Sequence, residues 1–308
     1  MTAFADRAER LAAIAEGLDL VGNFPLLKVA RLPGDLFARL RNTVNLYLYA
    51  TLDSWYRDRT FSLNSELLSD AAEAIRGLPN ITPNGLVLPK RQNYLAYNMV
   101  HAAVAAIVAE LELKAHIATI HAPINVRIVD GRADPRIDQR PRASVKWHSD
   151  MWAGEPAAAV IVFIPVFGAP GALGVRWIEP RSFPTELTGP LDDFREGASV
   201  IEGGREYAVS FDPGVILLSD PFLVHATQRN ADALRLSIDF RFVSRRPVPS
   251  DALAPGTRGE NYLPYQEWSD VGTGRVLTTE APLAPYSGPD VATANEYAAP
   301  FIIRRLDD

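Results

Sequence analysis

Apolar positions in the first part of the chain recur at the spacing of α-helices. Leu11, Ile14 and Leu18 follow one another at intervals of three and four residues. Between residues 34 and 55 an apolar side chain recurs every four positions, at Leu36, Leu40, Val44 and Leu48. This period places the apolar side chains on one face of a helix. Helices are therefore predicted over residues 8–18 and 34–55.

Two more helices are predicted before residue 120. One covers Glu66 to Ile75, with Ser65 in the position of an N-cap, and the other covers Ala102 to Leu113, which is rich in alanine and valine. Between these helices a loop or short strands are predicted by the helix breakers Pro79, Pro83, Gly85 and Pro89.

From about residue 122 the pattern changes to that of β-strands. Residues 123–129 alternate apolar and polar side chains, so one face of this strand is apolar and the other carries Asn125 and Arg127. Residues 157–166 form a continuous apolar run, which is typical of a strand buried on both faces.

The later strands are short and are joined by turn residues. Residues 207–211 and 215–219 flank the turn sequence Asp212-Pro213-Gly214, and residues 234–243 alternate again. Short strands joined by Pro and Gly turns are typical of a double-sheet jelly roll rather than of a parallel sheet. The predicted fold class is therefore mainly β with flanking helices.

We expect residues 1–308 to form one domain, because 47% of the residues are hydrophobic and can build a sizeable core. Residues 1–119 are predicted to be a mostly helical support and residues 120–246 the jelly-roll core. Residues 247–308, with many Pro, Gly, Ser and Thr, are predicted to be a loop-rich C-terminal extension.

Charge and targeting signals restrict the partners. The chain has 31 basic and 37 acidic residues, a net charge of −6, and no basic tract. A small-molecule substrate is therefore expected, with neither nucleic acid nor a membrane as partner. No apolar stretch follows the charged residues 2–10, and the apolar run at 157–168 is shorter than the roughly 20 residues that span a bilayer. We expect a cytoplasmic protein; the sequence leaves its oligomeric state open.

Three residues from two distant segments match the ligand set of a mononuclear iron site. His148 and Asp150 are two residues apart, so on a strand their side chains point the same way. His225 follows a turn and an apolar strand and would arrive from another strand. Because the chain has no cysteine, any metal must use His, Asp or Glu. Two imidazoles and one carboxylate can occupy one face of an Fe(II) octahedron and leave positions for a bidentate cosubstrate and O2.

Arg235 and Ser237 follow His225 at a distance of ten and twelve residues and share one face of the predicted strand. A guanidinium group together with a hydroxyl group can hold the distal carboxylate of 2-oxoglutarate. Thr227, two residues after His225, adds a possible hydrogen bond if the strand continues.

A His-x-Asp pair by itself is common and seldom binds a metal. His101, His116 and His121 are interpreted as structural or surface residues. The hypothesis of a metal site therefore depends on the combination of His148, Asp150 and His225 with the arginine and serine that follow.

Three segments carry a resemblance to the Fe(II)/2-oxoglutarate-dependent oxygenases. They are Trp147–Pro156, His225–Asn230 and Arg235–Phe242, and the similarity covers roughly residues 120–245. Within that superfamily the chain is most similar to the phytanoyl-hydroxylase-like branch and to the oxygenase-like proteins of streptomycin-type carbohydrate and antibiotic gene clusters.

The resemblance implies a double-stranded β-helix in which His148, Asp150 and His225 bind Fe(II), and Arg235, Ser237 and, with less support, Thr227 bind 2-oxoglutarate. It implies that O2 and 2-oxoglutarate are consumed, that succinate and CO2 are released, and that a small polar metabolite of secondary metabolism is hydroxylated or otherwise oxidised. Halogenating relatives have a small residue in place of the carboxylate of Asp150, so halogenation is disfavoured.

Four residues near the predicted metal segment are candidates for substrate binding. Asn125 and Arg127 lie on the polar face of one strand, although Arg127 is equally compatible with a partly buried ion pair. Lys146 and Trp152 lie two and four positions from His148, so a regular strand would point their side chains toward the metal. A bulge would turn Lys146 away, and Trp152 is equally compatible with the core.

Two other functions are compatible with a jelly roll. One is a cupin-type metal enzyme that does not use 2-oxoglutarate, although such enzymes usually recruit more histidines than the five found here. The other is a noncatalytic sugar-binding jelly roll, which has no use for the three predicted ligands and Arg235.

Overall fold

The long strand β10 (Leu234–Ser244) organises the main sheet of the computed structural model, which describes residues 4–168, 171, 173–257, 262–286 and 301–306. Strand β10 pairs antiparallel with β5 (Ala159–Phe167) along one edge. Its other edge is shared by β4 (Asn125–Asp130) near the start and β3 (Ile117–His121) near the end. All three neighbours of β10 are therefore antiparallel to it, as the predicted jelly roll requires.

Four further strands extend this sheet. Beyond β5 lie β8 (Val215–Ser219), β2 (Leu27–Arg31) and β1 (Leu20–Phe24), and beyond β3 lies β11 (Tyr262–Pro264). Strands β1 to β3 were not predicted, since residues 1–119 were interpreted as mostly helical. Each has five residues, which is too short for an alternating pattern to stand out, and β2 is stabilised by its pairing with β8, a contact between residues nearly 190 positions apart.

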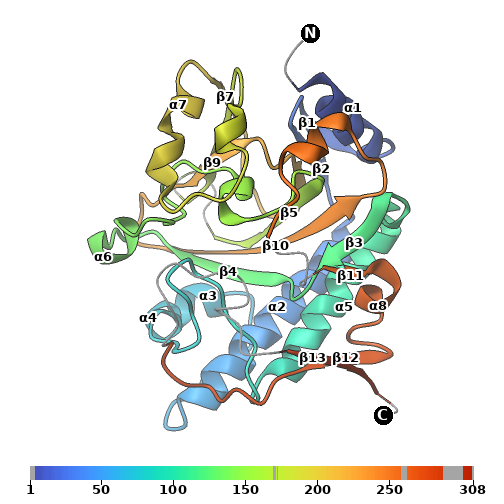
Figure 1. Ribbon diagram of the computed structural model, residues 1–308. Coiled ribbons are helices and arrows are strands. Elements are labelled where there is room, and N and C mark those ends of the chain that lie inside the picture. Colours follow the sequence, from blue (N-terminus) through green and yellow to red (C-terminus); the bar gives the residue numbers. More distant parts are fainter. Residues whose placement is uncertain (1–3, 169–170, 172, 258–261, 287–300, 307–308) are drawn as a thin grey trace.

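A second, smaller sheet faces the main one. It consists of β7 (Arg205–Tyr207), β6 (Val175–Glu179) and β9 (Val224–Thr227), all antiparallel. Aromatic side chains fill part of the space between the sheets; the rings of Phe163 from β5 and Trp177 from β6 meet edge to face at 5.5 Å. Two facing antiparallel sheets confirm the predicted jelly roll (Figure 1). The strand predicted over 207–211 was misplaced, because β7 ends at Tyr207.

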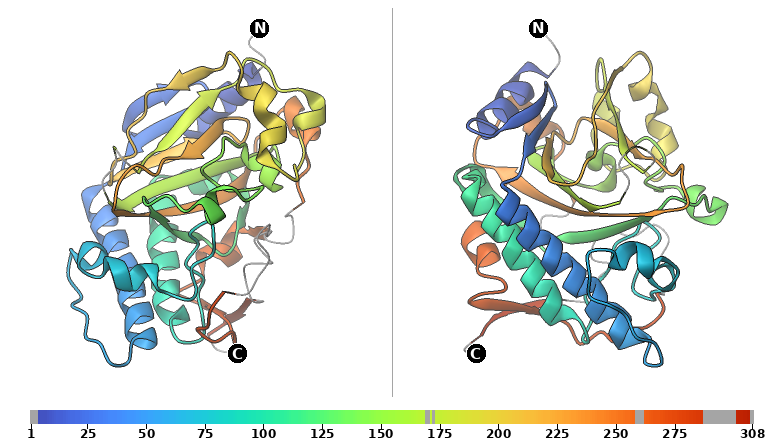
Figure 2. Two further views of the ribbon diagram at one scale, coloured as in Figure 1. Left: turned by 90° about the vertical axis from the view of Figure 1, so that its left-hand side faces the viewer. Right: turned by 180° about the vertical axis from the view of Figure 1, so that it is seen from behind.

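The outer face of the main sheet is covered by the long helices α2 (Gly34–Trp55) and α5 (Tyr94–Glu110), which lie side by side beneath it (Figure 2). Alternate residues of β10, from Leu236 to Phe242, join these helices in one buried apolar cluster. The intervening residues of β10 consequently point toward the space between the sheets.

The remaining elements are short. The bounds of α2 agree with the prediction, whereas the helix predicted over 66–75 is divided into α3 (Leu67–Asp70) and α4 (Ala72–Arg76), with no side-chain cap from Ser65. Helix α5 begins eight residues before the predicted start; it is buried around most of its circumference, so no apolar stripe marks its beginning. The other helices are α1 (Ala5–Ile14), α6 (Pro135–Asp138), α7 (Ala198–Ile201) and α8 (Tyr265–Ser269).

The C-terminal extension is less irregular than predicted where the structure describes it. Besides β11 and α8 it contains the hairpin of β12 (Arg275–Thr278) and β13 (Ile302–Arg305), while parts of the predicted loop, residues 258–261, 287–300 and 307–308, lie outside the described residues. In the described part of the chain, no helix combines the length and the apolar character needed to cross a membrane.

Candidate metal and cosubstrate site

A pocket of about 110 Å³ lies between the two sheets. Its lining joins side chains that are up to 157 residues apart in the sequence. Eight of the ten predicted site residues line it: Asn125, Arg127, His148, Asp150, His225, Thr227, Arg235 and Ser237. The fold therefore brings the three predicted ligands and the predicted cosubstrate residues to one place.

The two histidines are neighbours across a β-bridge. The backbone N–H of His148 donates to the carbonyl of His225 at 2.9 Å, and the reverse bond measures 2.8 Å. In each ring Nδ1 faces a backbone carbonyl, that of Lys146 at 2.8 Å for His148 and that of Leu223 at 3.5 Å for His225. A carbonyl can only accept, so Nδ1 carries the proton in the neutral ring and Nε2 keeps its lone pair.

Burial keeps both rings neutral. It lowers the pKa of His148 to about 3. It also lowers the pKa of His225 to about 4. The His148 ring stacks on Phe194 with a centroid distance of 4.7 Å and an interplanar angle of 4°, which holds its orientation. Two neutral imidazoles with Nε2 lone pairs are suitable donors for a divalent metal.

Asp150 reaches the pocket by a different route from the one predicted. Residues 148–150 are not a regular strand: His148 makes an isolated bridge, and Asp150 begins a 3-10 helix (Asp150–Ala153) that is capped by Ser149, whose Oγ accepts from the N–H of Met151 at 3.2 Å. The predicted side-by-side geometry on one strand was therefore wrong, although both side chains line the pocket. Burial raises the pKa of Asp150, and the nearby charge of Arg241 opposes that rise.

Two of the predicted ligand atoms, in Asp150 and His225, lie farther apart than adjacent ligands of one octahedral metal ion do. Asp150 Oδ2 and His225 Nε2 are 3.9 Å apart. Ligands at about 2.1 Å from one ion lie about 3 Å apart when adjacent in an octahedron and at most about 4.2 Å apart when opposite. As placed, no group of three or more His, Asp or Glu residues in the described part of the chain forms a ready metal-binding arrangement. A shared ion would require the three side chains to move closer together.

Arg235 is the most unusual side chain in the pocket. It is 3% exposed, donates one N–H to the carbonyl of Leu173, and lies over the ring of Phe211 at 4.7 Å. Its Nε has no hydrogen-bond partner among the described residues. Burial lowers the pKa of Arg235 to about 9. A buried guanidinium without a carboxylate is destabilising by itself, so this position favours an anionic ligand.

Arg127 and Asn125 line the same pocket but have a partner. The carboxylate of Asp239 accepts from Asn125 Nδ2 at 2.7 Å and from Arg127 Nε at 2.8 Å. Burial alone would raise the pKa of Asp239, but the charges of Arg127 and Arg241 outweigh it and hold the pKa at about 2. The ion-pair interpretation of Arg127 is thus confirmed, and its direct contact with a substrate stays a prediction.

Two predicted substrate residues point elsewhere. Lys146 Nζ lies 3.2 Å from Asp193 Oδ1 and does not line the pocket, because the irregular backbone around His148 breaks the parity of a strand. Trp152 does not line the pocket either. It is fully buried in an apolar cluster with Phe194, and its Nε1 donates to the carbonyl of Leu187 at 2.8 Å. Both pocket assignments were wrong because the backbone is not a regular strand: it is irregular before His148, and from Asp150 onward it follows a 3-10 helix.

Several pocket residues were missed by sequence reasoning. Asp239 and Arg241 continue the alternation of Arg235 and Ser237 along β10, so the period of two could have identified them. Arg142 and Asn84 come from loops and Phe194 begins a short 3-10 helix, and no local pattern marks any of the three.

Comparison with known proteins gives structural likenesses only. No family profile matches the chain, and no curated protein matches it. Among solved structures, AviO1 from Streptomyces viridochromogenes Tue57 is 19% identical, with 78% of this chain and 97% of that chain covered and a TM-score of 0.42. The carbocyclase SnoK from nogalamycin biosynthesis, described as a non-heme alpha ketoglutarate dependent enzyme, is 13% identical, with 85% and 95% covered and a TM-score of 0.42.

A third similar structure is SnoN, the non-heme alpha ketoglutarate dependent epimerase from nogalamycin biosynthesis. It is 16% identical, with 92% of this chain and 97% of that chain covered and a TM-score of 0.37.

Proposed function

We propose that this protein is an Fe(II)- and 2-oxoglutarate-dependent oxygenase that oxidises a small polar metabolite of secondary metabolism and releases succinate and CO2. One observation carries the proposal: the two histidines, Asp150 and the buried Arg235 line one pocket between the sheets, and the Nε of Arg235 has no hydrogen-bond partner among the described residues. Each feature has a structural explanation when taken alone, but their convergence supports a metal-binding donor set next to an anion-binding group.

The donor set fits iron. His148 and His225 would offer Nε2, since Nδ1 of each faces a carbonyl, and Asp150 would offer a carboxylate oxygen. Backbone carbonyls on the far ring nitrogen orient ligating histidines in this way in many metal sites. Two histidines and one carboxylate are the donors used by non-heme Fe(II) oxygenases, which need open positions for other ligands.

Arg235 and Ser237 fit the distal carboxylate of 2-oxoglutarate. Both are buried on the pocket face of β10, at 3% and 1% exposed, and the guanidinium can donate to both oxygens of a carboxylate. When bound, iron and 2-oxoglutarate would supply the oxidising chemistry. The protein's own side chains would bind and orient these groups, and the aromatic rings of Phe163 and Phe194 give the pocket apolar surface.

The proposal is tested by adding 2-oxoglutarate to the Fe(II)-loaded protein without oxygen. We expect a visible charge-transfer band that saturates with 2-oxoglutarate and is absent in Asp150→Ala. Succinate formation in air, screened with a panel of small polar metabolites, then identifies the substrate. Iron binding without any response to 2-oxoglutarate would favour the cupin-type alternative, and no iron binding at all would refute both.

A further inference from the structure

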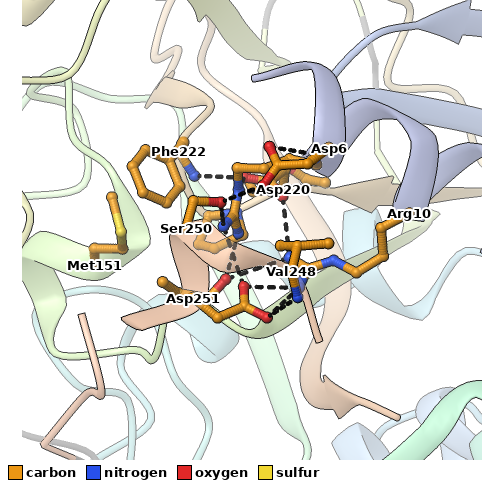
Figure 3. A network of polar contacts seen from close by, with 12 residues as sticks. Asp6, Arg10, Met151, Asp220, Phe222, Val248, Ser250 and Asp251 are labelled. Atoms are coloured by element: carbon orange, nitrogen blue, oxygen red, sulfur yellow. Dashed lines mark hydrogen bonds and ion pairs between the residues drawn. The ribbon is translucent and has the colours of Figure 1, made fainter. Parts of the chain in front are cut away.

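A buried network of charged side chains lies outside the pocket and connects α1 to the rest of the fold (Figure 3). Arg7 and Arg10 of α1 are 0% and 1% exposed, and Asp220, in the connection between β8 and β9, is 1% exposed. Arginine and aspartate are almost never fully buried unless they are paired. A network of this kind therefore needs an explanation.

The charges of the network are matched. Arg7 Nε donates to both oxygens of Asp220, at 2.8 and 3.0 Å, and Arg10 Nη1 donates to both oxygens of Asp251 at 2.8 Å. Cross-contacts join the two pairs, from Arg10 to Asp220 at 3.4 Å and from Arg7 to Asp251 at 3.2 Å. Both arginines also donate to the carbonyl of Ala157, just before β5. Three separate segments are thus attached to α1.

Asp220 also shapes the turn that leads to His225. Its Oδ1 accepts from the N–H of Phe222 at 3.0 Å, and its carbonyl accepts from the N–H of Leu223 at 3.0 Å. The Arg7 guanidinium lies over the Phe222 ring at 4.3 Å. The turn of residues 220–223 is therefore held from one side by α1.

The other side of this turn contacts one proposed metal ligand and the residue between the other two. The carbonyl of Pro221 accepts from Ser149 Oγ at 2.6 Å, and Ser149 stands between His148 and Asp150 in the sequence. The carbonyl of Leu223 faces Nδ1 of His225 at 3.5 Å. One four-residue turn is thus connected to both segments that carry the proposed ligands.

We propose that Arg7 and Arg10 are positioning residues, which act through Asp220 and the 220–223 turn to hold His148, Asp150 and His225 in place. The inference rests on the proposed function for the identity of the ligands. Neither arginine lines the pocket, so neither acts on a substrate directly. Stability alone does not explain a charged network at this position, because apolar side chains of similar volume often stabilise a core as well as buried ion pairs do.

The test compares two network variants with a matched control. Asp220→Asn removes the charge that the arginines bind, while the amide oxygen can still accept from Phe222. Arg7→Lys keeps the positive charge but loses the two-oxygen contact. Leu11→Ala truncates a buried residue of the same helix that belongs to the apolar cluster and not to the network. Hydrogen–deuterium exchange of peptides covering residues 145–153 and 219–227 and Co(II) affinity are measured well below each unfolding temperature.

All three variants should unfold at lower temperature than the wild type. Only Asp220→Asn and Arg7→Lys should show faster exchange in both peptides. These two variants should also bind Co(II) about tenfold or more weakly than the wild type, as is found when residues that orient metal ligands are substituted. Exchange and affinity equal to those of Leu11→Ala would overturn the inference, and so would unfolding of both network variants where Leu11→Ala stays folded. A wild type that binds no Co(II) would refute the proposed function, while the exchange comparison would still decide whether the network positions the turn.

Discussion

Two arginines in the same pocket differ in their partners. Arg127 and Arg235 both line the pocket, and their strands are adjacent. Arg127 shares the carboxylate of Asp239, whereas Arg235 donates to a single carbonyl and keeps an Nε without a partner among the described residues. The free energy of a buried charge depends on whether an opposite charge is within reach. An anionic ligand therefore gains the most binding free energy from pairing with Arg235.

At this scale we predict that Arg235→Ala raises the 2-oxoglutarate concentration needed for half-saturation about tenfold or more, because the loss of a charge-assisted hydrogen bond costs about 1.5–3 kcal/mol. Anaerobic titration of the Fe(II) protein measures this. Arg31→Ala is the control, since Arg31 is an exposed residue at the end of β2. Equal values for both variants would remove Arg235 from its proposed role.

Among the elements, the 3-10 helix of Asp150–Ala153 connects the pocket to an apolar cluster. Asp150 at its start lines the pocket, and Trp152 packs under residues 194–197. A Cβ atom on Gly197 would lie 2.1 Å from the Trp152 ring, so only glycine fits there. The position of Asp150 consequently depends on the packing of a residue that does not reach the pocket.

Gly197→Ala should therefore destabilise the protein by about 1–3 kcal/mol, as overpacking of a core does. It should also weaken metal binding, because Trp152 cannot move without its short helix. Thermal unfolding and Co(II) titration check the two effects. Gly189→Ala is a matched control with open space around the new methyl group; a similar loss of stability in both variants would contradict the packing argument.

A buried histidine connects helices α5 and α8. His101 Nε2 lies 2.8 Å from the carbonyl of Trp268, and burial lowers the pKa of His101 from 6.5 to about 4. The unfolded chain binds a proton near pH 6.5 while the folded chain does not, so lowering the pH from 6.5 to 4 favours unfolding. This one residue accounts for about 3 kcal/mol of that loss.

The free energy of unfolding of His101→Gln should thus depend less steeply on pH between 6.5 and 4, since glutamine keeps a donor but does not titrate. Guanidinium unfolding at several pH values measures both slopes. The other buried histidines titrate alike in both proteins and cancel in the comparison. Identical slopes would mean that His101 is not held neutral by the fold.

Across the whole molecule, we propose that the chain folds as one cooperative unit. The largest apolar cluster contains residues of α1, α2 and α5, of the main sheet, and of α8 and β12 near the C-terminus. The charged network adds Asp251, from a 3-10 turn after β10, to its contacts with α1. The C-terminal extension is therefore part of the core.

A chain ending at residue 246 should consequently show no cooperative unfolding transition, because it lacks Trp268 of the cluster and Asp251 of the network. Circular dichroism during heating measures this. A chain ending at residue 300 loses β13, whose residues are mostly exposed, and Phe301, which is only partly buried against the cluster; it should retain the transition. A cooperative transition in the shorter chain would show that the extension folds onto an already stable domain.

The sequence by itself determined which side chains can do the chemistry. The absence of cysteine restricts metal ligands to His, Asp and Glu, and the period of two along residues 234–243 puts Arg235 and Ser237 on one strand face. The four-residue period determined α2, because its apolar stripe packs against one surface. These features depend on residues that are neighbours along the chain, so local pattern reasoning was sufficient.

Only the tertiary structure decided how these side chains meet. The backbone bridge of His148 with His225 and the pairing of Arg127 with Asp239 depend on which segments lie opposite each other. So does the position of Arg235 Nε, which has no hydrogen-bond partner in the described part of the chain. The same holds for β2, which is a strand because β8 pairs with it, and for Lys146 and Trp152, which the irregular backbone turns away from the pocket. Burial and pairing energies arise between distant residues, and no local pattern in the sequence encodes them.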